Sequence, residues 1–229
     1  MAENLIPILV IIVALILLWQ LRRFFQACRR ANRVDWGRDW MNLLDGLNRL
    51  FCYRYHRLNL VRLRIPKSGP AIITANHVSG LDPLLLLASS RRTIHFLIAK
   101  EEYERFGLNW LFRAIKSIPV DRETRPDLAL RAAMRTLQEG HVVAIFPHGG
   151  IHTDLDSPCR IKPGAVRLAQ LTGADILPLR ISGIRGAGHV VRGVLLRSRA
   201  QLEAFPKISA GERDLKDLRD ELQQILDSG

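Results

Sequence analysis

Cysteine is scarce in this chain and forms no recognisable motif. The three cysteines are Cys28, Cys52 and Cys159, and no C-x-x-C pattern occurs among them. An odd number of separated cysteines argues against the disulfide framework of a small secreted protein. The pattern suits a reducing compartment such as the cytoplasm and gives no indication of function.

The chain also lacks the motifs of nucleic-acid-binding proteins, although it is strongly basic. It has 34 lysines and arginines against 22 acidic residues, a net charge of +12. The charge is uneven, since residues 1–65 contain eleven arginines and four acidic residues. That stretch has no helix-turn-helix, zinc-finger or RNP-like pattern, so we expect anionic membrane lipids rather than nucleic acid as partners.

The charges around an N-terminal apolar block, residues 5–19, are in the reverse order to those of a secretory signal peptide. Signal peptides carry positive charge before the block and a small-residue cleavage site after it. Here Glu3 precedes the block, and five arginines follow it. The positive-inside rule then places everything after Leu21 on the cytoplasmic side of the inner membrane. We expect an uncleaved, single N-terminal anchor; the alternative is a buried core helix.

The apolar block is short for a membrane span, because as a helix it measures about 23 Å against about 30 Å of hydrocarbon. It either spans marginally or enters one leaflet. Between Trp36 and Tyr55, apolar residues recur at helical spacing among arginines. We expect this second segment to lie in the lipid interface, with packing on the domain as the alternative. The predicted division is a membrane-associated segment, residues 1–57, and a globular domain, residues 58–229.

Apolar β-type runs alternate with helical patterns from about Leu58 onward. The predicted strands cover residues 71–75, 94–99, 142–146 and 176–182, and the predicted helices cover residues 83–89, 126–138 and 165–172. This alternation is typical of an α/β fold whose sheet is covered by helices on both faces. Residues 183–199 are interpreted as a glycine-rich loop and strand, and the tail from Ser209 as a charged closing helix.

A histidine and an aspartate five positions apart follow the first predicted strand. On a regular helix His77 and Asp82 would lie about 140° apart, so they meet only if His77 lies in the turn before the helix. Gly80 makes such a turn easy. An aspartate that fixes the tautomer of a histidine lets the imidazole take a proton from an alcohol near neutral pH. Asp82 also fits a helix N-cap before Pro83, which does not exclude catalysis. Ser79 lacks a nucleophile elbow and is interpreted as a turn residue.

Four sequence blocks resemble, in order, those of the PlsC-like glycerolipid acyltransferases, a family that includes the lysophosphatidic acid acyltransferases. They are residues 76–83 (NHVSGLDP), residues 118–122 (IPVDR) with residues 99–101 (AKE) before them, residues 146–150 (FPHGG) with residues 161–164 (IKPG) after them, and residues 176–179 (ILPL). The match covers roughly residues 65–185. The resemblance implies a glycerolipid acyltransferase-like α/β domain with no cofactor beyond its co-substrate, a thioester of coenzyme A or of acyl carrier protein. The implied reaction moves the acyl chain to the free hydroxyl of 1-acylglycerol 3-phosphate without an acyl-enzyme.

The resemblance also implies roles for individual residues. His77 is the expected general base, and Asp82 is expected to orient it. Arg122 is expected to contact the acceptor phosphate, because a guanidinium matches phosphate geometry; the alternative is a surface ion pair with Asp121. Two lysines are weaker phosphate candidates, since a lone lysine is usually a solvated surface charge: Lys100 and Lys162.

The third block departs from the family's usual Phe-Pro-Glu-Gly-Thr-Arg-Ser. Phe146, Pro147 and Gly149 match it, whereas His148 stands where the glutamate is expected and the last three positions are Gly150, Ile151 and His152. In relatives this block helps to hold the glycerophosphate, so the acceptor stays open. Another lysophospholipid, or an acylated amino-acid lipid, is one alternative. A catalytically silent lipid-binding protein of the same fold is another.

The same block has two further interpretations. The two glycines allow close backbone approach, and their amides would form an anion-binding nest. His148 either hydrogen-bonds a hydroxyl or phosphate of the acceptor or serves as a spacer in a turn. A metal site of His148, His152 and Asp154 would need a helix to bring the histidines to one face, and the Gly-Gly pair favours a loop, so we expect no metal.

Overall fold

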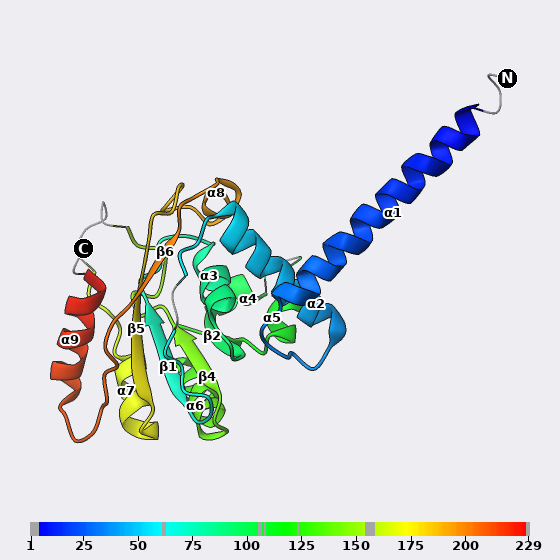
Figure 1. The fold of residues 1–229 in the computed structure, drawn as a ribbon. Helices are drawn as coiled ribbons and strands as arrows, with labels where there is room; N and C mark the ends of the chain where they lie inside the picture. Colours follow the sequence, from blue (N-terminus) through cyan, green and yellow to red (C-terminus); the bar gives the residue numbers. More distant parts are fainter. Residues whose placement is uncertain are drawn as a thin grey trace.

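The structure, a computed structural model, describes residues 5–60, 63–104, 107, 109–122, 124–153 and 159–227. A six-stranded sheet forms its centre, with the order β3-β2-β4-β1-β5-β6 (Figure 1). The strands are β1 (Ala71–Ala75), β2 (Ile94–Ala99), β3 (Ile118–Val120), β4 (Val142–Ile145), β5 (Asp175–Ser182) and β6 (Gln201–Ala204). The first five are parallel, and β6 runs antiparallel to β5.

Helices cover both faces of the sheet, which confirms the predicted α/β class. Every residue of β1 is buried, and neighbouring side chains point to opposite faces: Ile73 packs in one apolar cluster and Ile72 in the other. The first cluster includes residues of α2 (Asp39–Leu50), the π-helix η2 (Phe51–Tyr55) and α3 (Asp82–Ser89). The second includes residues of α6 (Pro126–Gln138), α7 (Gly164–Thr172) and the predicted closing helix α9 (Leu215–Asp227).

The predicted strand within residues 183–199 is wrong. After β5 the chain forms a loop and then the short helix α8 (Val190–Leu195), and the strand comes later, as β6. A short apolar run does not distinguish a helix from a strand, which explains the error. Strand β3 and the short helices α4 (Lys100–Tyr103) and α5 (Asn109–Ala114) were not predicted.

Helix α1 (Leu5–Ala31) has 27 residues, well beyond the predicted block, and is therefore about 40 Å long. Figure 1 shows it extending away from the domain. Its segment Pro7–Ala31 is long and apolar enough to cross a membrane, and its most apolar window is not buried at all. The buried core helix, our alternative, does not fit this exposure.

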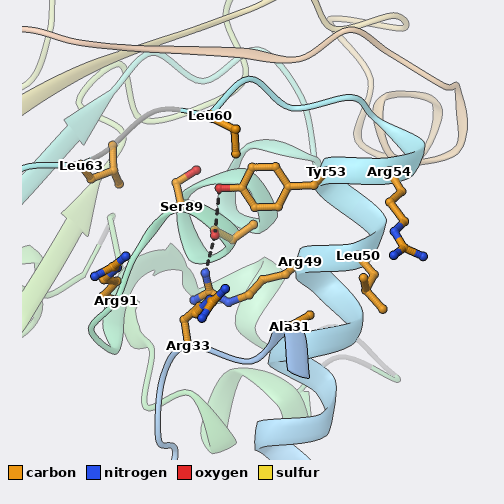
Figure 2. Close-up of a pocket in the computed structure, with 11 residues that line it drawn as sticks. Ala31, Arg33, Arg49, Leu50, Tyr53, Arg54, Leu60, Leu63, Ser89 and Arg91 are labelled. Carbon is orange, nitrogen blue, oxygen red and sulfur yellow. Dashed lines mark hydrogen bonds between the residues drawn. The ribbon is translucent and has the colours of Figure 1, made fainter. Parts of the chain in front are cut away.

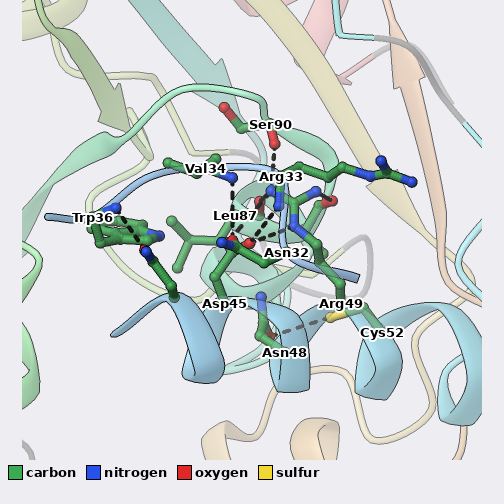
Figure 3. A network of polar contacts seen from close by, with 12 residues as sticks. Asn32, Arg33, Val34, Trp36, Asp45, Asn48, Arg49, Cys52, Leu87 and Ser90 are labelled. Atoms are coloured by element: carbon green, nitrogen blue, oxygen red, sulfur yellow. Dashed lines mark hydrogen bonds and ion pairs between the residues drawn. The ribbon is translucent and has the colours of Figure 1, made fainter. Parts of the chain in front are cut away.

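Helix α2 packs on the domain through polar side chains, as Figure 3 shows. The Arg49 guanidinium forms an ion pair with Asp45 at 2.6 Å and donates to the carbonyl oxygens of Ala88 and Ser90, both at 2.6 Å, at the end of α3. Arg49 and Asp45 are buried, whereas Trp40 and Leu47 of the apolar stripe are about 40% exposed. The helix thus packs on the domain and still presents apolar side chains outward. The domain boundary at residue 57 stays a prediction.

Candidate active site

His77 and Asp82 meet in the turn between β1 and α3, as the sequence predicts. The His77 Nδ1 atom lies 2.8 Å from Asp82 Oδ2. Because an ionised carboxylate only accepts hydrogen bonds, Nδ1 is the donor in this contact, and in a neutral imidazole the lone pair is then on Nε2. The His77 side chain is 19% exposed and that of Asp82 is fully buried. The pair therefore combines a fixed tautomer with access from outside.

Asp82 is held by the turn that precedes it. Its Oδ2 atom also accepts from the backbone N–H groups of Val78 (2.6 Å) and Ser79 (2.8 Å), and its Oδ1 accepts from Ser79 Oγ (2.9 Å). These bonds compensate the burial of a charge. The N-cap interpretation of Asp82 is wrong, since the N-cap of α3 is Leu81 and Asp82 bonds residues outside the helix. Ser79 supports the aspartate, consistent with a turn residue.

Helix α8 packs directly on this turn, a feature that the sequence did not reveal. A Cβ atom on Gly193 would lie 2.5 Å from the Cβ of Ser79, and one on Gly80 would lie 2.5 Å from the carbonyl oxygen of Val190. The Gly188 N–H donates to the Val78 carbonyl at 2.9 Å. Both close contacts require glycine, and the sequence singled out Gly80 only for the turn it forms.

The loop after β4 packs on the other side of His77. The Phe146 ring stacks on the His77 imidazole with centroids 4.3 Å apart, and the His152 N–H donates to the His77 carbonyl at 2.7 Å. The Gly149 N–H donates to the Phe146 carbonyl at 3.0 Å. That bond uses one of the two amides expected to form an anion-binding nest, so the nest is not formed as predicted. The first and third blocks nevertheless share one site.

His148 is buried behind this loop. Its side chain is 4% exposed, and its Nε2 atom lies 3.5 Å from a carboxylate oxygen of Asp227, at the end of α9. That separation is too long for a good hydrogen bond, and neither ring nitrogen has a hydrogen-bond partner among the described residues. Burial lowers the pKa of His148, partly offset by the Asp227 carboxylate. We infer that His148 is neutral, and the predicted bond to an acceptor stays a prediction.

A cavity of about 280 Å³ lies beside Phe146. Five of the predicted site residues line it: Arg122, Phe146, Pro147, Gly149 and Lys162. The Lys162 side chain lies across Gly149, whose φ of +82° and missing Cβ make room for it. The other walls are apolar residues of β2, β3, β4, α6 and α7. The cavity thus offers two cations at its edge and an apolar interior.

The remaining candidates lie apart from this cavity. Lys100 does not line it, and its Nζ is 3.5 Å from Asp121, the residue considered as a partner of Arg122. Gly150 does not line it either. The His148 and His152 rings stack with centroids 5.3 Å apart. Asp154, the third member of the metal hypothesis, lies outside the described residues.

A larger hollow, of about 520 Å³, lies where α1, α2 and α3 meet (Figure 2). Arginines surround it together with Tyr53 and Ser89, but neither His77 nor Asp82 lines it. In the figure the Tyr53 hydroxyl and the Arg49 guanidinium both point to the same carbonyl of α3. Size alone therefore does not identify the active site. The smaller cavity is the better candidate because Phe146, which lines it, stacks on His77 of the histidine–aspartate pair.

Comparison with known proteins finds acyltransferases among the relatives of this chain. A 1-acyl-sn-glycerol-3-phosphate acyltransferase of Bacillus subtilis is 29% identical over 120 residues, 52% of this chain and 59% of the relative. A probable 1-acyl-sn-glycerol-3-phosphate acyltransferase of Mycoplasma genitalium is 31% identical over 130 residues, 53% of this chain and 47% of the relative. The chain thus spans about half the length of the curated relatives it matches.

The fold and the family are shown by two further matches. The crystal structure of the 1-acyl-sn-glycerophosphate acyltransferase PlsC from Thermotoga maritima superposes with a TM-score of 0.61 at 21% identity, covering 84% of this chain and 81% of that one. At this identity the likeness concerns the fold alone. The sequence model described as Acyltransferase matches residues 60–182, more than half of the chain. The chain belongs to the acyltransferase family.

Proposed function

We propose that this protein transfers a fatty acyl chain from an acyl thioester to the free hydroxyl of 1-acylglycerol 3-phosphate at a membrane. The observation that carries the proposal is the 2.8 Å contact between His77 Nδ1 and the buried Asp82 carboxylate. It leaves His77 Nε2 ready to accept a proton. We take the acceptor from the names of the relatives. We infer the membrane location from the apolar helix α1.

In the proposed reaction His77 Nε2 takes the proton of the acceptor hydroxyl as its oxygen attacks the thioester carbonyl. The C–S bond then breaks, the ester forms, and the thiolate takes the proton back from the imidazolium. Asp82 stabilises the positive charge that His77 carries between these steps. Arg122 and Lys162 bind the acceptor phosphate at the edge of the cavity. The donor is coenzyme A or acyl carrier protein, which present the same thioester.

We also propose the placement of the enzyme. Helix α1 anchors it in the inner membrane, and the domain lies on the cytoplasmic side, because arginines follow the apolar segment. Protease digestion of sealed vesicles of known orientation tests this. Protection of the domain when the cytoplasmic face is exposed to protease would overturn it.

A second acceptor is favoured by one observation. His148 occupies the position where the family has glutamate, and it is buried against α9 rather than lining the cavity. The phosphate-holding role of that position is therefore altered. A different lysophospholipid, or an acylated amino-acid lipid, is the second candidate acceptor.

The experiment that tests the function is an acceptor panel. The purified full chain in lipid vesicles receives a labelled acyl thioester, either of coenzyme A or of acyl carrier protein, with one lysolipid at a time. We expect a labelled ester with 1-acylglycerol 3-phosphate and none with the His77→Ala variant. If no acceptor is acylated, or if His77→Ala works as well as the unchanged chain, the proposal fails. Preference for another lysolipid would select the second candidate.

A further inference from the structure

The segment around α8 is basic and apolar at once. Residues 176–202 contain five arginines and no acidic residue. Four large apolar side chains of this segment are exposed, and Val191 and Leu195 are 62% and 65% exposed. The other two are Val190 and Leu196. Exposed apolar side chains flanked by arginines are typical of a segment that lies on an anionic membrane.

An arginine-lined hollow adjoins α8. It measures about 440 Å³, and no carboxylate is among the residues that line it. The Tyr55 hydroxyl of η2 donates to the Leu195 carbonyl at 2.6 Å, and Arg197 Nε donates to the Tyr55 carbonyl at 3.2 Å, so η2 and α8 hold each other in place. The lining arginines are Arg57, Arg185, Arg197 and Arg199. A guanidinium cluster of this kind matches the phosphate groups of lipids.

The position of α8 indicates which side of the domain would face the membrane. Figure 1 shows α8 on the upper rim of the domain, on the side toward which α1 points. The same helix packs on the turn that holds His77 and Asp82, through Gly193 and Gly80. A membrane that contacts α8 is therefore next to the catalytic turn.

We propose that the exposed face of α8, with the four arginines of the adjoining hollow, is a second membrane contact that docks on anionic phospholipid. We call these eight residues the α8 surface: Val190, Val191, Leu195, Leu196, Arg57, Arg185, Arg197 and Arg199. Its apolar side chains enter the boundary between headgroups and acyl chains, and its arginines bind lipid phosphates. Docking fixes the orientation of the domain, which α1 alone leaves free to tilt.

The insertion depth of α8 tests the proposal directly. Cys28 and Cys52 are buried, so a Cys159→Ser background leaves an engineered cysteine as the accessible thiol among the described residues. An environment-sensitive fluorophore is attached at Leu195→Cys or, as the control, at Leu171→Cys. Leu171 is 55% exposed at the end of α7, just before β5 begins, whereas α8 follows the end of β5. The two labels therefore lie at opposite ends of the strands.

In vesicles that contain phosphatidylglycerol, we expect the label at 195 to shift its emission to the blue and to be quenched several-fold more by doxyl-labelled lipid than the label at 171. Pure phosphatidylcholine should weaken the quenching. Equal quenching at both positions would overturn the proposal. A blue shift without doxyl quenching would also overturn it, because a second copy of the chain or another protein would then cover α8.

The arginines are tested with charge-matched variants. The triple substitution Arg185→Gln, Arg197→Gln and Arg199→Gln should reduce quenching at 195 in anionic vesicles. The control removes the same charge from exposed arginines of α6 and α7, at positions 131, 135 and 167, and should leave quenching unchanged. If both triple variants lose the same amount of quenching, net charge alone explains the effect. The assignment of these arginines to lipid binding would then be overturned. No substrate is present, so failure here is distinct from failure of the proposed acyl transfer.

Discussion

Two histidines follow neighbouring parallel strands, and their environments differ. His77 lies beyond the end of β1 and His148 beyond the end of β4, so both stand at the same edge of the sheet. A carboxylate contacts each ring, at 2.8 Å for His77 and at 3.5 Å for His148. The His77 side chain is 19% exposed, whereas that of His148 is 4% exposed.

The difference separates a histidine that is paired with a buried carboxylate from one whose charge is disfavoured by burial. His77 has its tautomer fixed by a buried carboxylate and an accessible second nitrogen, the properties that a general base needs. We infer that His148 is neutral because burial lowers its pKa, and its nitrogens form no hydrogen bond within the described residues. Both histidines follow a strand end, so the closer carboxylate is what distinguishes His77 as the proposed general base.

The largest expected effect contrasts the two rings directly. His77→Ala removes the base, and turnover with saturating acceptor should fall by roughly 10²–10⁴-fold. His148→Ala should lower turnover far less, because its ring is away from the reacting atoms in the proposed mechanism. Initial rates in vesicles measure both, with thermal melts to show that each variant is folded. If both variants lost the same amount of turnover, the contrast drawn between His77 and His148 would be wrong.

Asp82→Asn sharpens the role of the carboxylate. An amide oxygen in place of Oδ2 still accepts from His77 and from the two backbone N–H groups, so the tautomer is retained while the charge that stabilises the imidazolium is lost. A charge-assisted hydrogen bond exceeds a neutral one by about 1–2 kcal/mol. Turnover should therefore fall by roughly 5–30-fold, with acceptor KM little changed. A loss as large as that of His77→Ala would show that asparagine fails to keep the tautomer.

Arg122→Ala tests whether the cavity beside Phe146 holds the phosphate. Arg122 is exposed at the cavity edge, so we expect acceptor KM to rise by about tenfold, below the full value of a buried charged hydrogen bond. Arg125→Ala, which removes an exposed arginine that lines a different hollow, is the control. A KM that is unchanged in Arg122→Ala, or equally raised in the control, would remove this phosphate assignment.

The sequence predicted best those features that depend on neighbouring residues. The central strands appeared as continuous apolar runs because both faces are covered, and the His77–Asp82 turn followed from five-residue spacing and a glycine. Helix α1 was predicted too short because the apolar block ends before Arg22, although arginine is a good helix former and the helix continues through it.

The features that the sequence did not predict depend on contacts between distant segments. Arg49, which is buried with Asp45, donates hydrogen bonds to carbonyl groups at the end of α3, about forty residues away. His148 contacts Asp227 at the end of α9, and Gly193 is required by its contact with Ser79. Pattern and propensity describe neither kind of contact, because they carry no information on which distant surface a helix will cover.

The smallest expected effect concerns the stability of the folded protein in acid, and it probes the burial of His148. Burial lowers its folded-state pKa, so the unfolded chain binds a proton that the folded chain does not. Stability is full above the ordinary histidine pKa and falls as pH decreases below it, with a slope of at most about 1.4 kcal/mol per pH unit for one proton. His148→Gln removes this contribution, while His56 and His95, whose pKa values burial also lowers, remain in both proteins.

Denaturant unfolding in detergent micelles between pH 8 and pH 5 measures the difference. At pH 8 the free energies of unfolding of the two proteins should differ only because their packing differs. Toward pH 5 the unchanged chain should lose more stability than His148→Gln. Parallel curves would mean that His148 takes up a proton as readily when folded as when unfolded. Burial would then not keep the ring neutral, and the contrast with His77 would depend only on the position of the nearest carboxylate.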